Sequence, residues 1–179
     1  MHYVTDKLIL RKLTTEDAED LWRIYGDPAT NVFNPAGPYP SFAFASTRLS
    51  EWIKEYEQHG YGNWAVALRD RPERIIGFAG ICVRTLNGAL TNNLGYRFST
   101  DVWGKGIATE FCRFALNHGF QSLGLQEITA VVRPDHLASQ RVLIKAGMHL
   151  TGTTDDVPGS APSQVYKLSI KEWHAWQKR

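Results

Sequence analysis

The sequence predicts a single domain over residues 1–179 with an α+β fold, in which helices flank a mixed, mostly antiparallel sheet. Three observations support this prediction. The length of 179 residues is typical of one domain with a substantial core. Three strand-like runs follow one another between residues 64 and 98, and strands alternate with helices after residue 107.

The first third of the chain is predicted to form a strand and two helices. Residues 8–13 read as a strand, and the T-x-x-D pattern of residues 14–17 is a weak capping-box variant that begins a helix. Asp27-Pro28 ends this helix, because a residue before proline avoids helical geometry. Residues 31–40 contain three prolines and a glycine and are predicted to be a loop, and a second helix is predicted over residues 41–58.

The sheet is predicted to follow. Its first strands cover residues 64–68, 75–83 and 90–98, and their turn-rich links, Arg71-Pro72 and Asn87-Gly88, favour antiparallel neighbours. The remaining elements are a helix over residues 107–120, a strand over 128–132, a helix that ends at Lys145-Ala146-Gly147, and strands near 149–153 and 164–169.

Composition excludes several classes of protein. A net charge of +2 is too small for a concentrated basic face, so we expect no nucleic-acid partner. Cys82 and Cys112 have no Cys or His at ligand spacing, which argues against a disulfide framework or a structural zinc site. Residues 1–7 lack the features of a secretory signal, and no apolar run has the length of a membrane span. We therefore expect a cytoplasmic protein without a membrane partner.

The most informative segment is the glycine-rich turn from Val102 to Thr109, which joins a strand to a helix. Two glycines flank Lys105, so successive N–H groups and the helix N-terminus can form an anion site suited to pyrophosphate. A tight turn that binds nothing is the alternative, because short motifs are weak signals. The P-loop pattern is absent, and Thr109 stands where a Rossmann motif needs its third glycine.

Five segments together resemble the GNAT N-acetyltransferases, in the branch of ribosomal-protein N-terminal acetyltransferases. They are residues 6–18, Ile76–Gly80, Leu94–Phe98, the turn Trp103–Thr109, and Pro134–Met148. The resemblance implies a GNAT fold with a splayed central pair of parallel strands, here residues 90–98 and 127–132. It also implies acetyl-CoA as cosubstrate and no metal.

The resemblance further implies where the cofactor is held. Its pantetheine arm would bond the backbone near Phe98, and the helix that starts near His136 would contact the pantetheine and the thiol. The pyrophosphate would be bound by the N–H groups of the turn: Trp103, Gly104, Lys105, Gly106, Ile107, Ala108 and Thr109. His136 stands where the family usually has asparagine, so it can keep this contact, tune it with pH or abandon it.

Two residues are candidates for catalysis. Ser139 occupies the position of a family serine near the sulfur, where its hydroxyl can bond or protonate the leaving thiolate; the alternative is a helix serine that bonds its own backbone. The tyrosine that many relatives use one helical turn later is Leu143 here. Asn93 replaces a glutamate of several relatives, and it can orient a water or the amine, or simply face solvent. Four further residues are possible bases without a supporting motif: Asp156, Glu127, Tyr166 and His118.

The predicted function is acetyl transfer to a primary amine, either a protein N-terminus or a small molecule, by direct attack in a ternary complex. The alternative is an inactive acyl-CoA-binding sensor or scaffold, since the family tyrosine and glutamate are missing. A homodimer is compatible with the resemblance. The aromatic residues Phe33, Tyr39, Phe42 and Phe44 lie in or beside a segment that borders the acceptor site in relatives, and packing of that loop onto the core is the alternative.

Overall fold

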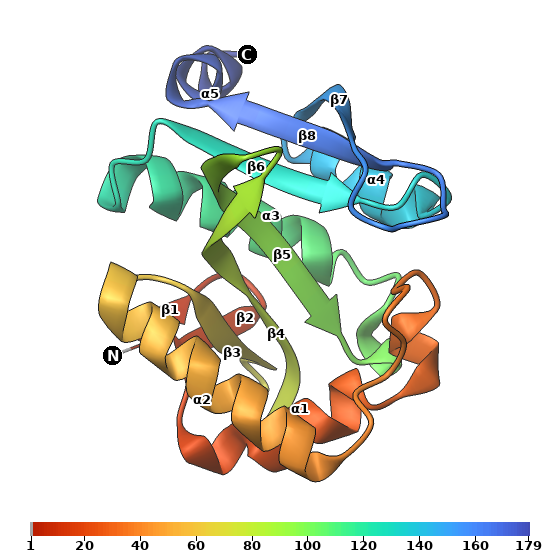
Figure 1. Ribbon diagram of the computed structural model, residues 1–179. Helices are drawn as coiled ribbons and strands as arrows, with labels where there is room; N and C mark the ends of the chain where they lie inside the picture. Colours follow the sequence, from red (N-terminus) through yellow and green to blue (C-terminus); the bar gives the residue numbers. More distant parts are fainter. Residues whose placement is uncertain (1) are drawn as a thin grey trace. The chain divides into compact units, whose positions relative to one another are not determined.

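The computed structural model describes residues 2–179, which form eight strands and five α-helices (Figure 1). In chain order these elements are β1 His2–Val4, β2 Leu8–Lys12, α1 Ala18–Tyr25, α2 Phe42–His59, β3 Asn63–Leu68, β4 Arg71–Leu86, β5 Ala89–Phe98, α3 Ile107–Asn117, β6 Glu127–Val132, α4 Leu137–Lys145, β7 His149–Thr154, β8 Ser163–Ser169 and α5 Ile170–Gln177. Helices α1 and α3 are each preceded by one short helical turn and followed by another.

The strands form a sheet in the order β1-β2-β3-β4-β5-β6-β8-β7. The register places β2 antiparallel to β1 and β3, and β8 antiparallel to β6 and β7. β5 and β6 are parallel, with Asn93 opposite Thr129. The predicted α+β class and its central parallel pair are confirmed, whereas β1 was not predicted and β4 extends beyond the predicted 75–83 at both ends.

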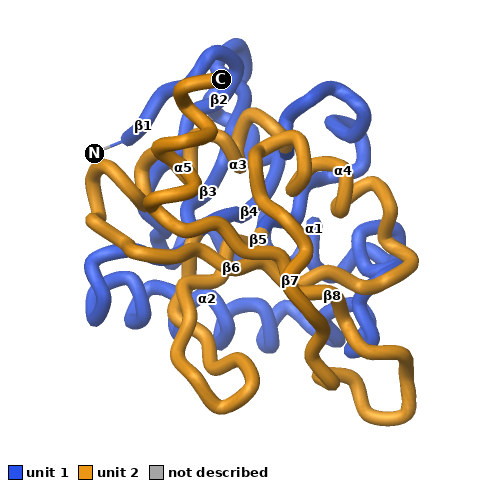
Figure 2. Tube along the Cα trace, turned by 90° about the horizontal axis from the view of Figure 1, so that it is seen from above, with its two compact units in different colours: residues 1–80, 96–108 blue, residues 81–95, 109–179 orange. Residues whose placement is uncertain are grey.

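The chain divides into two compact units, which Figure 2 shows in blue and orange. Unit 1 comprises Met1–Gly80 and Tyr96–Ala108, and unit 2 comprises Ile81–Gly95 and Thr109–Arg179. Each unit therefore contains part of β4 and part of β5, and the boundary crosses α3 after its second residue.

Helices α1 and α2 supply much of the core of unit 1. Leu21 and Ile24 of α1 and Leu49 and Trp52 of α2 are buried in one cluster with Phe78 of β4. With Ala18 and Ala45 of the same cluster, these apolar side chains recur at three- and four-residue spacing, so each helix buries one face and leaves the other to solvent. Burial of this apolar surface, rather than helix propensity, is what stabilises both helices.

An ion pair with a buried carboxylate fastens the start of the first helix to β2. Arg11 donates to both carboxylate oxygens of Asp17 at 2.7 and 2.9 Å, and the Asp17 side chain is only 4% exposed. The same carboxylate accepts the N–H of Thr14 at 2.8 Å, which is the interaction that the T-x-x-D pattern predicts. This confirms the predicted helix start, although the first turn, Thr15–Asp17, is a 3-10 helix.

We expect Asp17→Asn to lower the free energy of unfolding by about 1–2 kcal/mol, because it leaves Arg11 without its partner while Arg11 keeps part of its hydration. Denaturant unfolding measures this change. The control is Asp20→Asn, whose partner Arg23 lies 3.0 Å away in an exposed pair. It should cost less than about 0.5 kcal/mol. Equal changes in the free energy of unfolding would show that the pair of Arg11 with the buried Asp17 carboxylate stabilises the protein no more than an exposed pair does.

The helix predicted over residues 107–120 has a different C-terminal end. α3 stops at Asn117 and continues as a π-helical turn over His118–Ser122. A Cβ on Gly119 would lie 2.6 Å from Ile128 and 3.0 Å from Ile81, so glycine allows this turn to approach the strands closely. The glycine thus serves close packing of the π-helical turn against the strands.

The predicted end of the helix at residues 145–147 is confirmed in detail. Gly147 has a φ of 104°, and its N–H donates to Ile144 O at 3.0 Å. The N–H of Met148 donates to Leu143 O at the same distance. This pair of bonds is a Schellman motif, which satisfies carbonyls that the end of α4 would otherwise leave without donors.

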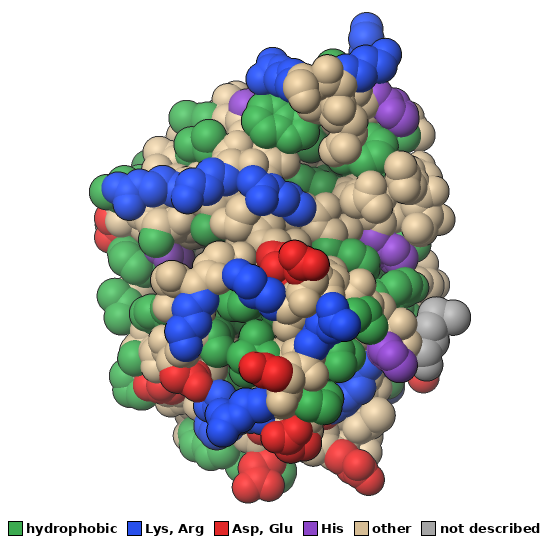
Figure 3. Space-filling view, turned by 180° about the vertical axis from the view of Figure 1, so that it is seen from behind, with side chains coloured by type: hydrophobic (Ala, Val, Ile, Leu, Met, Phe, Trp, Pro, Cys, Tyr) green, Lys and Arg blue, Asp and Glu red, His purple; other side chains and the backbone are tan. Residues whose placement is uncertain are grey.

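The surface and the cysteines agree with the composition. Basic and acidic side chains are interspersed in the lower part of the face in Figure 3, and a strip of basic side chains crosses its upper part. Both cysteines are buried and neither forms a disulfide within residues 2–179, and burial raises the pKa of Cys112 well above its ordinary value. No helix within residues 2–179 is long and apolar enough to cross a membrane.

Candidate functional site

The glycine-rich turn in unit 1 has the backbone geometry of an anion site. Gly104 and Gly106 have φ values of 73° and 75°, a left-handed conformation that side-chain-bearing residues rarely adopt. Such glycines reorient successive peptides, and α3 begins directly afterwards at Ile107. Among the described residues, the N–H groups of Gly104, Lys105 and Gly106 donate to no protein acceptor. The turn therefore presents donors beside the N-terminus of a helix.

The start of the turn and the residues before it are held by side-chain and backbone bonds. The Trp103 indole donates to the carbonyl of Phe98 at 2.9 Å, and the Trp103 N–H donates to Thr100 O at 3.2 Å. The Arg74 guanidinium lies 2.6 Å from Asp101 and, together with Ser99, lowers the pKa of this carboxyl to about 2. These bonds connect the end of β5 to the turn. They also occupy the Trp103 N–H, so the open donors begin at Gly104.

Lys7 is a neighbour of the turn that sequence reasoning missed. Its ammonium donates to the carbonyl of Lys105 at 3.2 Å and lies 3.9 Å from where a Cβ on Gly106 would be. Nearly one hundred residues separate Lys7 from the turn, and a single lysine after Asp6 carries no motif. Only the fold of unit 1 brings the two together.

Asn93 lies in unit 2, on β5, opposite Thr129 of β6. Thr129 is 1% exposed, and its hydroxyl has no hydrogen-bond partner among the described residues. A buried hydroxyl without a partner is uncommon and calls for an explanation such as a bound water or ligand. Thr129 was not predicted as a site residue, although a hydroxyl within the apolar run Ile128–Val132 was a signal that could have identified it.

His136 and Ser139 lie at the start of α4 in unit 2. His136 is the N-cap residue, and its side chain makes no capping hydrogen bond. Burial lowers the pKa of His136 below its ordinary value, although nearby Asp135 opposes this shift. The imidazole is therefore neutral at pH 7, which favours a contact role. Ser139 follows in the first turn of the helix and is half-buried.

We expect His136→Asn to keep the affinity for acetyl-CoA within about threefold, because an amide can make the contact that a neutral imidazole makes. Asparagine is also the better N-cap residue, so unfolding should require about 0.5–1 kcal/mol more free energy. Calorimetric titration and thermal unfolding measure the two effects. A large loss of affinity at unchanged stability would reject the contact role.

The four other possible bases lie in unit 2, and each of them contacts another side chain there. Glu127 lies 3.5 Å from Lys167, and Asp156 lies 3.9 Å from Arg133. The Tyr166 hydroxyl donates to Gln164 at 3.3 Å in a buried position. His118 is buried and stacked on Phe114, and burial lowers its pKa. None of these observations favours one of the four as a base.

In unit 1 the aromatic loop is well fixed, but most of its rings stay accessible. Tyr39 packs against Tyr25 and Phe44, and the Asn31 side chain donates to the carbonyls of Tyr25 and Asp27 at 2.9 and 2.8 Å. Three rings nevertheless remain exposed: Phe33 at 37%, Phe42 at 49% and Phe44 at 41%. Packing onto the core thus accounts for Tyr39 and leaves these three phenylalanines partly open to solvent.

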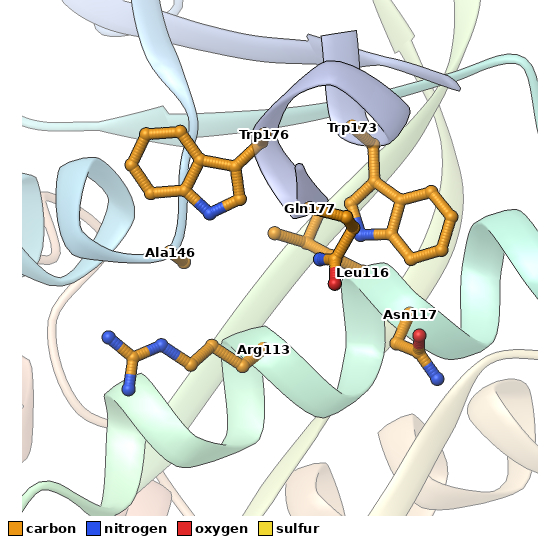
Figure 4. A pocket seen from close by; sticks show the side chains of 7 residues that line it. All are labelled: Arg113, Leu116, Asn117, Ala146, Trp173, Trp176 and Gln177. Atoms are coloured by element: carbon orange, nitrogen blue, oxygen red, sulfur yellow. The ribbon is translucent and has the colours of Figure 1, made fainter. Parts of the chain in front are cut away.

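A cavity of about 330 Å³ lies elsewhere in unit 2, between α3 and α5 (Figure 4). Trp173 is buried against Phe120, and the indole of Trp176 covers Gly147 at 3.1 Å from where a Cβ would be. The lining residues are Arg113, Leu116, Asn117, Ala146, Trp173, Trp176 and Gln177. None of the predicted site residues belongs to this set, so the cavity is not part of the candidate site.

The turn suits a pyrophosphate, because it combines open N–H donors, a helix N-terminus and two positions where a side chain would be strained. No group of three or more His, Cys, Asp or Glu residues that could hold a metal occurs within residues 2–179. The structure places Phe98 and the turn residues from Trp103 to Ala108 in unit 1, whereas Thr109, Asn93, His136 and Ser139 belong to unit 2.

Comparison with known proteins gives a consistent result. The family model "Acetyltransferase (GNAT) domain" matches residues 7–149. The uncharacterized N-acetyltransferase YoaA of Bacillus subtilis (strain 168) is 29% identical over 150 residues, which are 83% of this chain and 82% of YoaA.

Two solved structures show the same fold. A GNAT-family acetyltransferase from Bacillus anthracis has a TM-score of 0.79 at 21% identity, covering 96% of this chain and 99% of the other. A ribosomal-protein-S5-alanine acetyltransferase from Vibrio fischeri has a TM-score of 0.75 at 18% identity, covering 97% and 98%. Because the family model matches residues 7–149, the chain belongs to the GNAT acetyltransferase family, whose members use acetyl-CoA.

Proposed function

We propose that this protein transfers an acetyl group from acetyl-CoA to the N-terminal amine of a peptide or protein, by direct attack within a ternary complex. One observation carries the cofactor half of the proposal. Gly104 and Gly106 adopt the left-handed backbone conformation. The N–H groups of residues 104–106 lie beside the N-terminus of α3 and donate to no acceptor among the described residues. This geometry supports pyrophosphate binding by residues 104–109.

Acetyl-CoA supplies the activated acetyl group when it is bound. Ser139 has the role of a hydroxyl donor for the sulfur that leaves, and the neutral His136 contacts the pantetheine. Both residues lie at the start of α4, where the helix dipole also favours negative charge.

Asn93 has the role of holding the incoming amine, and the buried Thr129 hydroxyl that of holding a water that takes its proton. The amide oxygen of Asn93 can accept a hydrogen bond from an amine, and the Thr129 hydroxyl can accept one from a water. Thr129 is buried without a protein partner and lies opposite Asn93 in the β5–β6 register, which supports a shared polar contact. Neither group is a base at neutral pH, so the pair orients the proton transfer and does not itself accept the proton.

The choice of acceptor rests on the aromatic loop of unit 1. No charged residue occurs between Asp27 and Arg48, and three phenylalanines of this segment are partly exposed. The loop is tied to β5, because Arg97 donates to Asn31 at 2.8 Å and stacks over Tyr25 at 4.3 Å. A polyamine or an aminoglycoside would need carboxylates nearby, whereas an N-terminal residue with an apolar side chain suits an uncharged aromatic surface.

Thiol release from acetyl-CoA tests the proposal against a panel of amines. The panel contains peptides with apolar, acidic or basic first residues, free amino acids, polyamines and an aminoglycoside. We expect the highest kcat/KM for peptides with an apolar first residue and no detectable turnover of polyamines. Preference for a cationic amine would reject the acceptor class. Binding of acetyl-CoA without turnover of any amine would favour the sensor alternative.

A further inference from the structure

Lys7 contacts the glycine-rich turn, although it lies far from the turn in the sequence. It precedes β2, and its ammonium donates to Lys105 O at 3.2 Å. This distance is within the normal range for a hydrogen bond, and the donor carries a full positive charge. The contact joins two segments of unit 1 that are 98 residues apart in sequence.

The backbone of Lys7 is itself fixed, so its side chain starts from a defined position. The N–H of Arg69 donates to Lys7 O at 2.8 Å. The Thr5 N–H donates to Leu8 O at 2.9 Å, and the Thr5 hydroxyl accepts the N–H of Leu8 at 3.1 Å, which closes a turn around Lys7. The Arg69 guanidinium also donates to the carbonyl of Asp6 at 3.2 Å.

The contact of Lys7 with the Lys105 carbonyl also sets the direction of the next N–H group, that of Gly106. In a trans peptide the carbonyl oxygen and the following N–H point in opposite directions. When Lys7 holds the Lys105 carbonyl on one side of the turn, the Gly106 N–H is directed to the other side. Without this hold, the two glycines would leave the peptide free to rotate, because left-handed and right-handed conformations cost glycine about the same.

We propose that Lys7 is a positioning residue for pyrophosphate binding. This proposal rests on the proposed function. Its ammonium fixes the Lys105–Gly106 peptide so that the Gly106 N–H faces the phosphates. It also adds a positive charge behind the turn, 3.9 Å from the Cβ position of Gly106. Lys105 on the turn and Lys7 behind it are thus two cations that attract the same anion.

Calorimetric titration of Lys7→Met tests the proposal. We expect the Kd for acetyl-CoA to rise about tenfold, because one charge-assisted bond that orders the turn is lost. The Kd for dephospho-CoA, which keeps the pyrophosphate and lacks the 3′-phosphate, should rise by the same factor. Lys7→Arg should restore the affinity to within about threefold, since guanidinium also donates to carbonyls.

S-acetylpantetheine separates positioning from a general structural effect, because it carries no pyrophosphate. We expect its kcat/KM to be unchanged in Lys7→Met. The matched control is Lys54→Met on the exposed face of α2, which removes the same charge from unit 1 and should leave every parameter unchanged. Thermal unfolding verifies that each variant is folded.

Three results would overturn the inference. Wild-type binding of acetyl-CoA together with equal binding by Lys7→Met would show that Lys7 does not position the turn, while the proposed function would stand. An equal loss for acetyl-CoA and S-acetylpantetheine would assign Lys7 a general structural role. Failure of the wild-type protein to bind acetyl-CoA would instead remove the proposed function, and the role of Lys7 with it.

Discussion

Gly106→Asp is expected to raise the Kd for acetyl-CoA at least about 100-fold. The residue has a φ of 75°, which aspartate tolerates better than most residues, so the protein should still fold. Its Cβ would lie 3.9 Å from the Lys7 ammonium, so the carboxylate would stand close to that cation at the turn. There it would repel the phosphates and also take the charge of Lys7, and like charges placed together cost several kcal/mol.

Two further variants show whether charge or backbone strain causes this loss. Gly106→Ala adds the left-handed strain without the charge and should weaken binding only about fivefold, as a cost of about 1 kcal/mol implies. Gly60→Asp is the matched control, because Gly60 has a φ of 80° and open space at its Cβ position but ends α2. It should bind acetyl-CoA normally. Normal binding by Gly106→Asp would mean that the pyrophosphate does not bind at this turn.

Ser139→Ala is expected to lower kcat about 100-fold while the Kd for acetyl-CoA changes less than threefold. A hydroxyl that stabilises the leaving sulfur acts mainly as that sulfur gains charge, so its loss affects the transition state more than the bound ground state. Steady-state kinetics with a peptide acceptor, together with calorimetric titration, separates the two quantities.

Ser50 provides the control for this prediction. It is an exposed serine of α2 whose hydroxyl donates to Ser46 O at 3.2 Å, which is the ordinary behaviour of a helix serine. Ser50→Ala should leave kcat unchanged. If Ser139→Ala behaved in the same way, Ser139 would be a structural helix residue, and the thiolate would need another donor.

Local signals in the sequence predicted much of the fold. The cation-and-glycine ending of α4 and the T-x-x-D start before α1 depend on neighbouring residues, and the structure contains both. The two glycines of the turn were expected to let successive N–H groups form an anion site, and both have the left-handed conformation that reorients successive peptides. Each of these features involves residues within a few positions of one another, so periodicity and turn chemistry are sufficient to identify them.

Contacts between distant segments could not be predicted in the same way. The bond of Lys7 to the turn depends on how β2 folds beside it, and the pairing of Thr129 with Asn93 depends on the strand register. The role of Gly119 likewise depends on Ile81 and Ile128, which belong to two strands. A single sequence contains no local signal for these contacts, because their cause is tertiary packing.

Amine-dependent thiol release by the wild-type protein, beside Gly106→Asp, tests the central claim most directly. We predict that the wild-type protein releases thiol from acetyl-CoA only when an amine is present and fastest with a peptide that has a free apolar N-terminal residue, and that mass spectrometry finds the acetyl group on that amine. The variant should be inactive at the same concentrations. Failure of the wild-type protein to bind acetyl-CoA, or equal turnover by the two proteins, would contradict the account.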